Sequence, residues 1–190
     1  MTRLLLIRHG QSTWNAEGRW QGRSDPPLSE RGELDAAAAA AATALDEVDA
    51  IVSSDLTRAR RTAEIMAGGR RWDGVRVLPG LRERDVGVFT GHTRAEIESR
   101  WPGMLQRVPL DPPQAESRGS VLARAVASLH RISEWHPGRT VVAVTHGALI
   151  RILEGHLGAT DAGPTTNLSG RWVSLNDGRL SLGPRTELLP

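Results

Sequence analysis

The chain has 190 residues, among them 24 arginines, no lysine and 22 acidic residues, so its formal net charge is only +2. It also contains no tyrosine and no cysteine. The sequence pI near 10.6 therefore reports missing groups that titrate between histidine and arginine, rather than a strongly basic surface. The composition argues against a nucleic-acid partner, and it excludes disulfides, thiolate nucleophiles and cysteine-ligated metal sites.

The length and the share of apolar residues predict one domain over residues 1–190 with a sizeable core. The apolar run near the N-terminus covers only residues 4–7, which is too short for a signal peptide. No run reaches the roughly 20 apolar residues of a membrane span. We therefore expect a cytoplasmic protein that has no membrane partner.

Short apolar runs predict the strands of this fold. Buried strands are expected at residues 4–7, 50–52, 75–78 and 140–144. Two more strands, at 173–175 and 179–182, flank Asn176-Asp177-Gly178 and predict a hairpin with a primed turn.

The predicted helices alternate with these strands. Ser29 is the expected N-cap of a helix that runs through the seven alanines 36–42 to about Leu45. A helix over about 56–67 is expected to be capped by Ser54 or Asp55. Further helices are predicted at 93–100, 117–135 and 148–157, and connecting loops at 11–28, 81–91 and 108–114. The alternation predicts an α/β fold, a three-layer sandwich whose mainly parallel central sheet is flanked by helices.

Charged residues follow three of the predicted strands. Arg8-His9-Gly10 ends the first strand, His146-Gly147 ends the strand at 140–144, and Arg58 lies one turn into the helix after the second. The carboxyl ends of parallel strands meet at one crevice, so these residues are expected to converge there. Two guanidinium groups suit a doubly charged anion such as phosphate, because their planar fork makes paired hydrogen bonds.

Each of these signals is weak alone. An isolated Arg-His-Gly triplet more often belongs to an ordinary loop than to a catalytic site, and a single histidine after a strand is equally ambiguous. The remaining histidines show no metal-ligand spacing, so we expect no metal site and assign to the surface or to packing His92, His130, His136 and His156. The paired arginines Arg60-Arg61 and Arg70-Arg71 are predicted to lie on solvated faces.

The joint pattern is much more specific. The chain contains, in order, LIRHGQSTWN (6–15), RWQG (19–22), PLSERG (27–32), SSDLTRARRTA (53–63), LRERDVG (81–87), FTGHT (89–93) and VTHGALIR (144–151). In this order and spacing the segments resemble the histidine phosphatase superfamily, the phosphoglycerate mutase-like proteins, over about residues 3–157. The resemblance implies a phosphoglycerate mutase-like fold. One departure is PPQAES (112–117), which lacks both glycines of the similar PPGGES turn of phosphatase-type members and leaves the geometry of this loop open.

The resemblance implies catalytic roles for five residues. His9 matches the nucleophile that becomes a phosphohistidine, and Glu83 matches the acid that protonates the leaving oxygen. Arg8, Arg58 and His146 match the phosphate pocket. Further substrate contacts are implied for Gly10, Ser12, Asn15, Gln21, Gly22 and Gly147.

Physical chemistry agrees with these roles. Phosphoryl transfer depends on positioning and on stabilising negative charge, and Arg8, Arg58 and a protonated His146 would supply about three positive charges. His9 attacks only as neutral imidazole, with its other ring nitrogen held by a backbone carbonyl. The two arginines are expected to lower its pKa and keep it neutral.

The role of Glu83 stays open at this stage. Neighbouring cations favour its charged form, burial favours its protonated form, and a general acid must carry a proton when it acts. The alternative is an exposed loop carboxylate within the Arg82–Arg84 run.

The family pattern leaves two enzyme activities and one other class. Mutases of this kind carry an inserted segment with a lysine and paired arginines, whereas here about 24 residues separate Gly91 from Glu116 and no lysine exists. We therefore expect a metal-independent phosphomonoester phosphatase that needs no cofactor and acts on a small phosphorylated metabolite. A cofactor-dependent phosphoglycerate mutase is the alternative, and a non-catalytic phosphate-binding module is less favoured. The substrate-selecting residues are expected at 19–24 and 103–116, and a homodimer stays open.

Overall fold

The computed structural model describes residues 1–70, 72–161 and 163–189. Six strands form one sheet in the order β3-β2-β4-β1-β5-β6. Their bounds are β1 Thr2–Arg8, β2 Ala50–Ser53, β3 Val75–Val77, β4 Thr140–Thr145, β5 Ser169–Asn176 and β6 Arg179–Glu187. The neighbours among β3, β2, β4 and β1 pair in parallel, whereas β5 and β6 each pair antiparallel. The predicted α/β fold with a mainly parallel sheet is confirmed.

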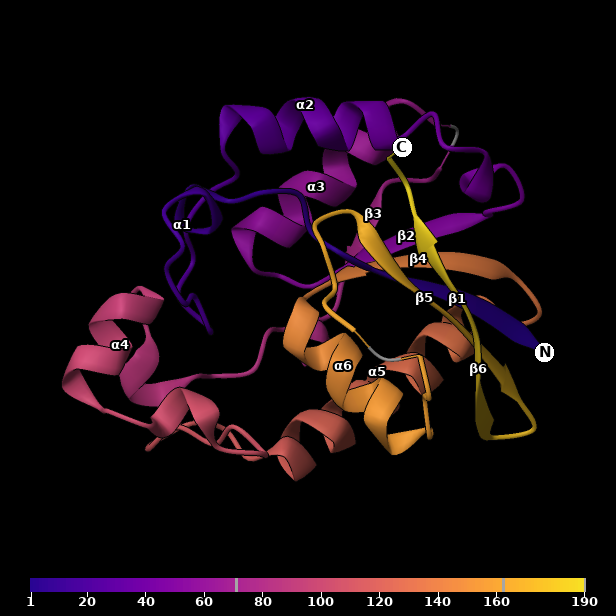
Figure 1. The fold of residues 1–190 in the computed structure, drawn as a ribbon. Helices are drawn as coiled ribbons and strands as arrows, with labels where there is room; N and C mark the ends of the chain where they lie inside the picture. The colour runs from indigo at the N-terminus through magenta and orange to yellow at the C-terminus, as the bar shows by residue number, and fades with distance from the viewer. Residues whose placement is uncertain (71, 162, 190) are drawn as a thin grey trace.

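Helices cover both faces of the sheet (Figure 1). The α-helices are α1 Thr13–Ala16, α2 Glu30–Ala39, α3 Thr57–Gly68, α4 Arg94–Arg100, α5 Arg118–Trp135 and α6 Gly147–His156. Short 3-10 turns occupy Thr43–Leu45, Pro79–Leu81, Gly87–Phe89 and Met104–Gln106. Helices α2 and α3 lie on one face, α5 and α6 lie on the other, and α4 projects beyond the end of the sheet. Among the described residues, no helix is both long and apolar enough to span a bilayer.

The central strands divide their side chains between two cores. On β1, Leu5 and Ile7 belong to the core between the sheet and helices α2 and α3, while Leu4 and Leu6 belong to the core between the sheet and helices α5 and α6. All four are fully buried. A strand alternates its side chains between the two faces, so a strand covered on both faces must be apolar at every position. This explains the uninterrupted apolar runs that predicted β1 and β4.

The predicted helix through the alanine run is too long. Helix α2 ends at Ala39, and the chain turns before Thr43–Leu45. Arg70 explains the early end, because its guanidinium donates to the carbonyl oxygens of Ala40, Ala42 and Leu45 at 2.7, 2.9 and 2.9 Å. A carbonyl satisfied by a side chain no longer needs a helical partner. Arg70 therefore is not on a solvated face as expected, and Arg71 lies outside the described residues.

The C-terminal hairpin has the predicted turn. Asp177 and Gly178 have φ of 48° and 77°, and positive φ at both central residues defines the primed type I turn. The two strands are longer than the predicted 173–175 and 179–182, because β5 extends back along β1 to Ser169.

We expect Arg70→Gln to lower the free energy of unfolding by about 2 kcal/mol, because three carbonyl groups lose a charged donor. Urea denaturation measures the change. Arg60→Gln is the matched control, since Arg60 is half-exposed and Glu64 is its only ion-pair partner among the described residues, and an exposed pair contributes about 0.5 kcal/mol. Equal effects of the two substitutions would contradict the capping role.

Candidate active site

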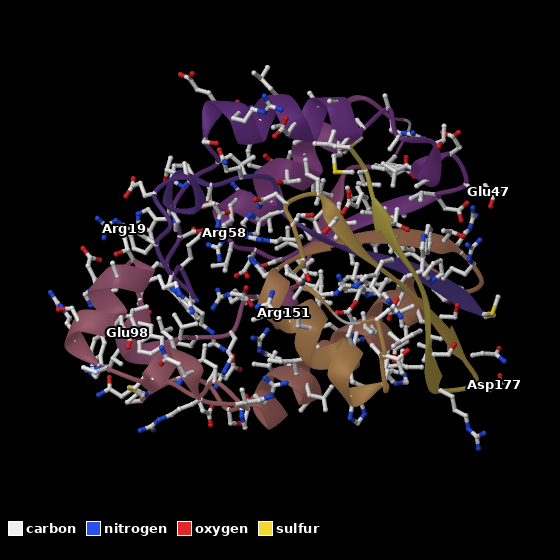
Figure 2. All side chains as sticks on the ribbon, viewed as in Figure 1. Arg19, Glu47, Arg58, Glu98, Arg151 and Asp177 are labelled. Atoms are coloured by element: carbon white, nitrogen blue, oxygen red, sulfur yellow. The ribbon has the colours of Figure 1, made fainter. Side chains whose placement is uncertain are left out.

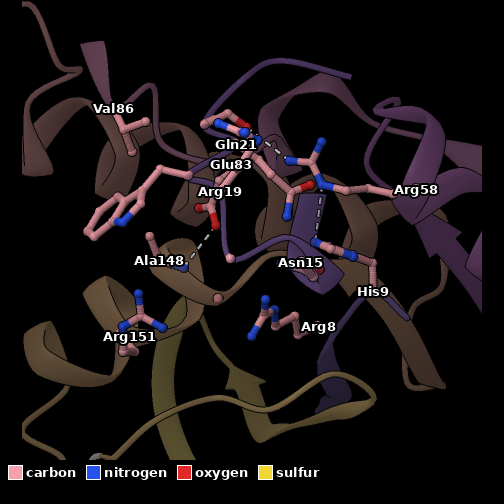
Figure 3. Close-up of a pocket in the computed structure, with 14 residues that line it drawn as sticks. Arg8, His9, Asn15, Arg19, Gln21, Arg58, Glu83, Val86, Ala148 and Arg151 are labelled. Carbon is pink, nitrogen blue, oxygen red and sulfur yellow. Dashed lines mark hydrogen bonds between the residues drawn. The ribbon is translucent and has the colours of Figure 1, made fainter. Parts of the chain in front are cut away.

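A cavity of about 320 Å³ opens at the carboxyl ends of β1 and β4 (Figure 3). In Figure 2, Arg19, Arg58 and Arg151 lie on this side, towards α4, whereas Glu47 and Asp177 mark the opposite end of the sheet. Eight residues predicted for the site line the cavity: Arg8, His9, Asn15, Gln21, Gly22, Arg58, Glu83 and Gly147. Six more complete the lining: Gly18, Arg19, Trp20, Val86, Ala148 and Arg151.

His9 has one defined tautomer. Its Nδ1 lies 2.6 Å from the carbonyl oxygen of Gly10, and Arg58 Nε lies 3.1 Å from its Nε2. A guanidinium only donates, so Nε2 accepts and Nδ1 carries the proton of the neutral ring. The predicted backbone carbonyl partner is therefore found. The nitrogen that carries the lone pair is the one beside Arg58 and the cavity.

The surroundings of His9 favour its neutral imidazole. Burial lowers the pKa of its imidazole well below the usual 6.5, and the positive charges of Arg58 and Arg8 lower it further. The hydrogen bond to the Gly10 carbonyl acts in the opposite direction and raises the pKa. The expected effect of the arginines is present, but burial is the larger cause. A neutral, tautomer-fixed imidazole is the form that can attack an electrophile.

Arg58 is fully buried and nevertheless has an acceptor for each nitrogen. In addition to His9, its Nη1 donates to the carbonyl oxygen of Ser24 at 2.7 Å and its Nη2 to that of Gly22 at 2.9 Å. Burial lowers its pKa to about 10, while the negative charges of Glu83 and Asp25 act to raise it. The guanidinium therefore stays charged at neutral pH. Gly22 has φ of 51°, and a Cβ there would lie 2.9 Å from Val86. Only glycine suits this turn.

The predicted cap of α3 is wrong. Thr57, its first residue, donates its backbone N–H and its hydroxyl to the carboxylate of Asp25 at 2.6 and 2.7 Å. Asp55 instead binds Arg82. The cap comes from 32 residues earlier in the chain, so no local sequence pattern identifies it. The contact joins the loop that holds Arg58 to the helix that carries Arg58.

Arg8 and the backbone of His9 are held by a segment that the sequence did not indicate. Arg8 Nη1 donates to the carbonyl oxygen of Thr165 at 2.8 Å. Asn167 Nδ2 donates to the carbonyl oxygen of His9 at 2.7 Å and lies 3.4 Å from Asn15 Oδ1. This segment lies between α6 and β5, beyond the last family-like motif. Only the tertiary pairing of β5 with β1 brings it to the site.

His146 lies behind His9 rather than on the cavity wall. It is fully buried, its ring centroid is 5.1 Å from that of His9, and its Nε2 lies 3.0 Å from Ser54 Oγ. Burial lowers the pKa of His146 well below 6.5, and Arg58, His9, Arg8 and Arg124 add to the effect. These surroundings favour the neutral ring over the protonated His146 expected from the sequence as a third cation. Its Nδ1 is buried and has no hydrogen-bond partner among the described residues.

Glu83 is a cavity residue and not an exposed loop carboxylate. Its Oε1 accepts the backbone N–H of Arg84 at 2.8 Å and its Oε2 accepts that of Ala148 at 3.1 Å, the latter drawn in Figure 3. Its two arginine neighbours turn away from the cavity. Arg82 pairs with Asp55, and Arg84 pairs with Asp111. Glu83 therefore contributes the only carboxylate among the cavity-lining residues that the structure describes.

Arg124 of α5 holds the loop that carries Glu83. It donates to the carbonyl oxygens of Gly80 at 2.9 Å and Glu83 at 3.0 Å, and also to that of Arg82. A second pair of contacts, both at 2.9 Å, joins it to the carboxylate of Glu116. The sequence indicated only that this position belongs to a helix. Its function in the site depends on a contact 41 residues apart in the chain.

Two predicted substrate contacts support the site from behind. Ser12 is fully buried, caps α1 and donates to Gln21 Oε1 at 2.9 Å. The N–H of Gly10 donates to Thr62 Oγ1 at 3.0 Å, and a Cβ on Gly10 would lie 2.8 Å from the carbonyl oxygen of Gly32. Neither residue lines the cavity.

The loop 103–116 is farther from the site than expected. None of its residues lines the main cavity, but Leu110 and Pro112 line an adjoining cavity of about 200 Å³, which shares Trp20 and Arg151 with it. The missing glycine at Gln114 does not abolish the turn, because Gln114 itself adopts φ of 62°. Of the predicted selecting residues, Arg19 to Gly22 reach the main cavity.

The donor set of the site is cationic. Among the described residues, no group of three or more His, Asp or Glu side chains is arranged to hold a metal ion. Four arginines and one glutamate line the cavity. Such a donor set is suited to an anion.

Residues 4–180 match the family model of the histidine phosphatase superfamily (branch 1), and the chain belongs to this superfamily. It is 38% identical to glucosyl-3-phosphoglycerate phosphatase of Mycobacterium tuberculosis over 92% of this chain and 88% of that protein. It is also 38% identical to a probable phosphoglycerate mutase of Cronobacter sakazakii, over 80% of this chain and 73% of that protein. A solved structure of a mycobacterial glucosyl-3-phosphoglycerate phosphatase in complex with VO3 superposes with a TM-score of 0.84 at 33% identity, covering 95% of this chain and 96% of that one.

We expect the His9 imidazole to be neutral, with its proton on Nδ1, at pH 6.5, where an ordinary histidine is half protonated. Long-range proton–nitrogen NMR spectra report both properties. Arg58→Met should raise the pKa of His9, because it removes a cation, whereas Arg60→Met, on the outer face of the same helix, should not. An imidazolium signal from wild-type His9 at neutral pH would contradict this electrostatic account.

Proposed function

We propose that the chain is a phosphomonoester phosphatase that works through a phosphohistidine on His9. The supporting observation is the neutral His9 whose Nε2 lies at an arginine-lined cavity with Glu83 in the same lining. Arg8 and Arg58 bind the phosphoryl oxygens, and the buried His146, whose ring centroid lies 5.1 Å from that of His9, supports the imidazole of His9. The arginines are preorganised by Thr165, Gly22 and Ser24, so little reorganisation precedes the reaction.

In the first step, the Nε2 lone pair of His9 attacks phosphorus while the bond to the leaving oxygen breaks. Arg58 Nε–H, which occupies this lone pair in the structure, transfers its hydrogen bond to a phosphoryl oxygen. The ring becomes a phosphorylated imidazolium, and its Nδ1–H remains bonded to the Gly10 carbonyl. That carbonyl stabilises the positive charge that the ring gains.

Glu83 acts in both steps. As a carboxylic acid it gives its proton to the leaving oxygen, and the resulting carboxylate then takes a proton from the water that attacks the phosphohistidine. The bond between phosphorus and Nε2 breaks, which returns neutral His9 and releases inorganic phosphate. The two backbone N–H donors on Glu83 hold the carboxyl group in place for both transfers.

A phosphoglycerate mutase is the second candidate, favoured by the 38% identity to a probable mutase. A mutase returns the phosphoryl group to a second substrate oxygen instead of to water. The described residues between α4 and α5 add nothing to the main cavity, and the chain has no lysine. Both observations favour water as the acceptor.

The proposal includes the setting of the reaction. The substrate is a small phosphorylated metabolite, and the reaction needs neither a metal ion nor an organic cofactor. We assign the reaction to the cytoplasm, to a single domain over residues 1–190, and to a protein that does not bind nucleic acid.

Purified protein should release phosphate from a panel of metabolite phosphates, including 3-phosphoglycerate, at the same rate with and without excess chelator. His9→Ala should lower kcat at least about 10³-fold, because the covalent route is lost. His156→Ala, at an exposed histidine of α6, should leave kcat unchanged. Retained turnover in His9→Ala would contradict the mechanism, and isomerisation of 3-phosphoglycerate faster than phosphate release would favour the mutase.

Glu83→Gln should lower kcat/KM for alkyl phosphates by about 10²–10⁴-fold, the usual contribution of general acid catalysis. For p-nitrophenyl phosphate, whose leaving group needs little protonation, the loss should stay below about tenfold. Steady-state kinetics with both substrates measure the difference. An equal loss for both substrates would show that Glu83 only shapes the cavity.

A further inference from the structure

The cavity holds more positive charge than a phosphoryl group requires. Its charged lining consists of Arg8, Arg19, Arg58, Arg151 and Glu83. The proposed function assigns two of these arginines to the phosphoryl group. Arg19 is already neutralised, because it pairs with Glu17 at 2.9 Å and Glu96 at 3.2 Å. One arginine therefore remains without an anion.

That arginine is Arg151, on the second turn of α6. It is exposed, and it makes no hydrogen bond or ion pair with the described part of the chain. Figure 3 shows it on the same side of the cavity as Arg8, with Arg58 on the other side. A long, unpaired side chain at a cavity wall is free to bind whatever enters.

Both guanidinium groups lie close to Gly147, a residue of the cavity lining. A Cβ on Gly147 would lie 3.0 Å from Arg151 Nη1 and 3.7 Å from Arg8 Nε. The two cations are close enough to interact. Burial lowers the pKa of Arg8, Glu83 opposes this, and the like charge of Arg151 lowers it further. An anion held at this point would relieve the repulsion.

We propose that Arg151 binds a carboxylate on the leaving group of the substrate and so selects phosphomonoesters that carry a carboxylate near the ester oxygen. This inference rests on the proposed function, which places the phosphoryl group against Arg8 and Arg58. A single uncompensated cation matches a monoanionic carboxylate better than a second, dianionic phosphate. The planar fork of arginine fits the two carboxylate oxygens.

Two matched substrate pairs test the proposal. O-phosphoserine and O-phosphoethanolamine differ only by a carboxylate, as do 3-phosphoglycerate and 2-hydroxyethyl phosphate. Wild-type enzyme should show at least about tenfold higher kcat/KM for the carboxylate-bearing member of a pair. Arg151→Gln should lower that value about 10–100-fold, the effect of one charge-assisted hydrogen-bonded pair, and the loss should be confined to the carboxylate-bearing member.

Two variants and one further rate sharpen the test. Arg151→Lys keeps the charge without the fork and should recover part of the loss. Arg94→Gln, an exposed arginine of α4 outside the cavity lining, should change neither substrate. The hydrolysis rate of the phosphohistidine should be the same in wild type and Arg151→Gln, because the leaving group has departed by that step.

Each outcome separates this inference from the function on which it rests. Equal losses for both members of a pair would place Arg151 on the phosphoryl group, and no loss would make it a bystander; either result overturns the proposal. If wild-type enzyme releases no phosphate from any phosphomonoester, the proposed function fails instead. Calorimetric binding of 3-phosphoglycerate and 2-hydroxyethyl phosphate to His9→Ala, with and without Arg151→Gln, then still measures the carboxylate preference.

Discussion

A charged guanidinium can be buried only where its N–H groups find acceptors, and Arg58 satisfies this condition with three of them. The acceptors are His9 Nε2 and the carbonyl oxygens of Gly22 and Ser24. The bond to His9 selects the tautomer of its imidazole, and the positive charge of Arg58 helps to lower the pKa of that ring. The two carbonyl contacts determine the path of the loop that lines one side of the cavity. One buried cation thus determines both the chemistry of His9 and the shape of the site.

The fold supplies these acceptors by bringing distant segments together at one edge of the sheet. Strand β1 delivers Arg8 and His9, the helix after β2 delivers Arg58, and β4 ends at His146. On the face of the sheet covered by α5 and α6, Arg124 of α5 binds backbone carbonyl groups of the loop that carries Glu83. The cations converge because the parallel strands end together, and the carboxylate of Glu83 is held in place by two backbone N–H donors.

The sequence predicted the parts of the site that depend on local patterns. The apolar runs of β1 and β4 and the Asp177-Gly178 turn follow from strand and turn chemistry, and His9, Arg58 and Glu83 followed from the ordered motifs. The errors come from contacts that are distant in the chain. Arg70 ends α2 within the alanine run because it binds the carbonyl groups of residues that follow the helix, and Asp25 caps α3 from 32 residues earlier in the chain.

The charge states of the site residues also could not be predicted from the sequence. His146 was expected to be protonated because it belongs to a phosphate pocket, but its complete burial and the nearby arginines favour the neutral ring. The family resemblance implies no role for Arg151 within residues 144–151, and its significance comes from the absence of a hydrogen-bond or ion-pair partner in the described part of the chain. Burial and pairing are properties of the tertiary structure, so residue type and spacing alone do not determine them.

The central claim is that phosphoryl transfer passes through Nε2 of His9. Its most direct test is to stop wild-type turnover with alkali, in which phosphohistidine is stable, and to map the phosphorylated peptide by mass spectrometry and NMR. We expect the phosphoryl group on the peptide that contains His9, bonded to Nε2, with Nδ1 unmodified. Turnover without a phosphorylated His9, or with the phosphoryl group on His146, would contradict the account.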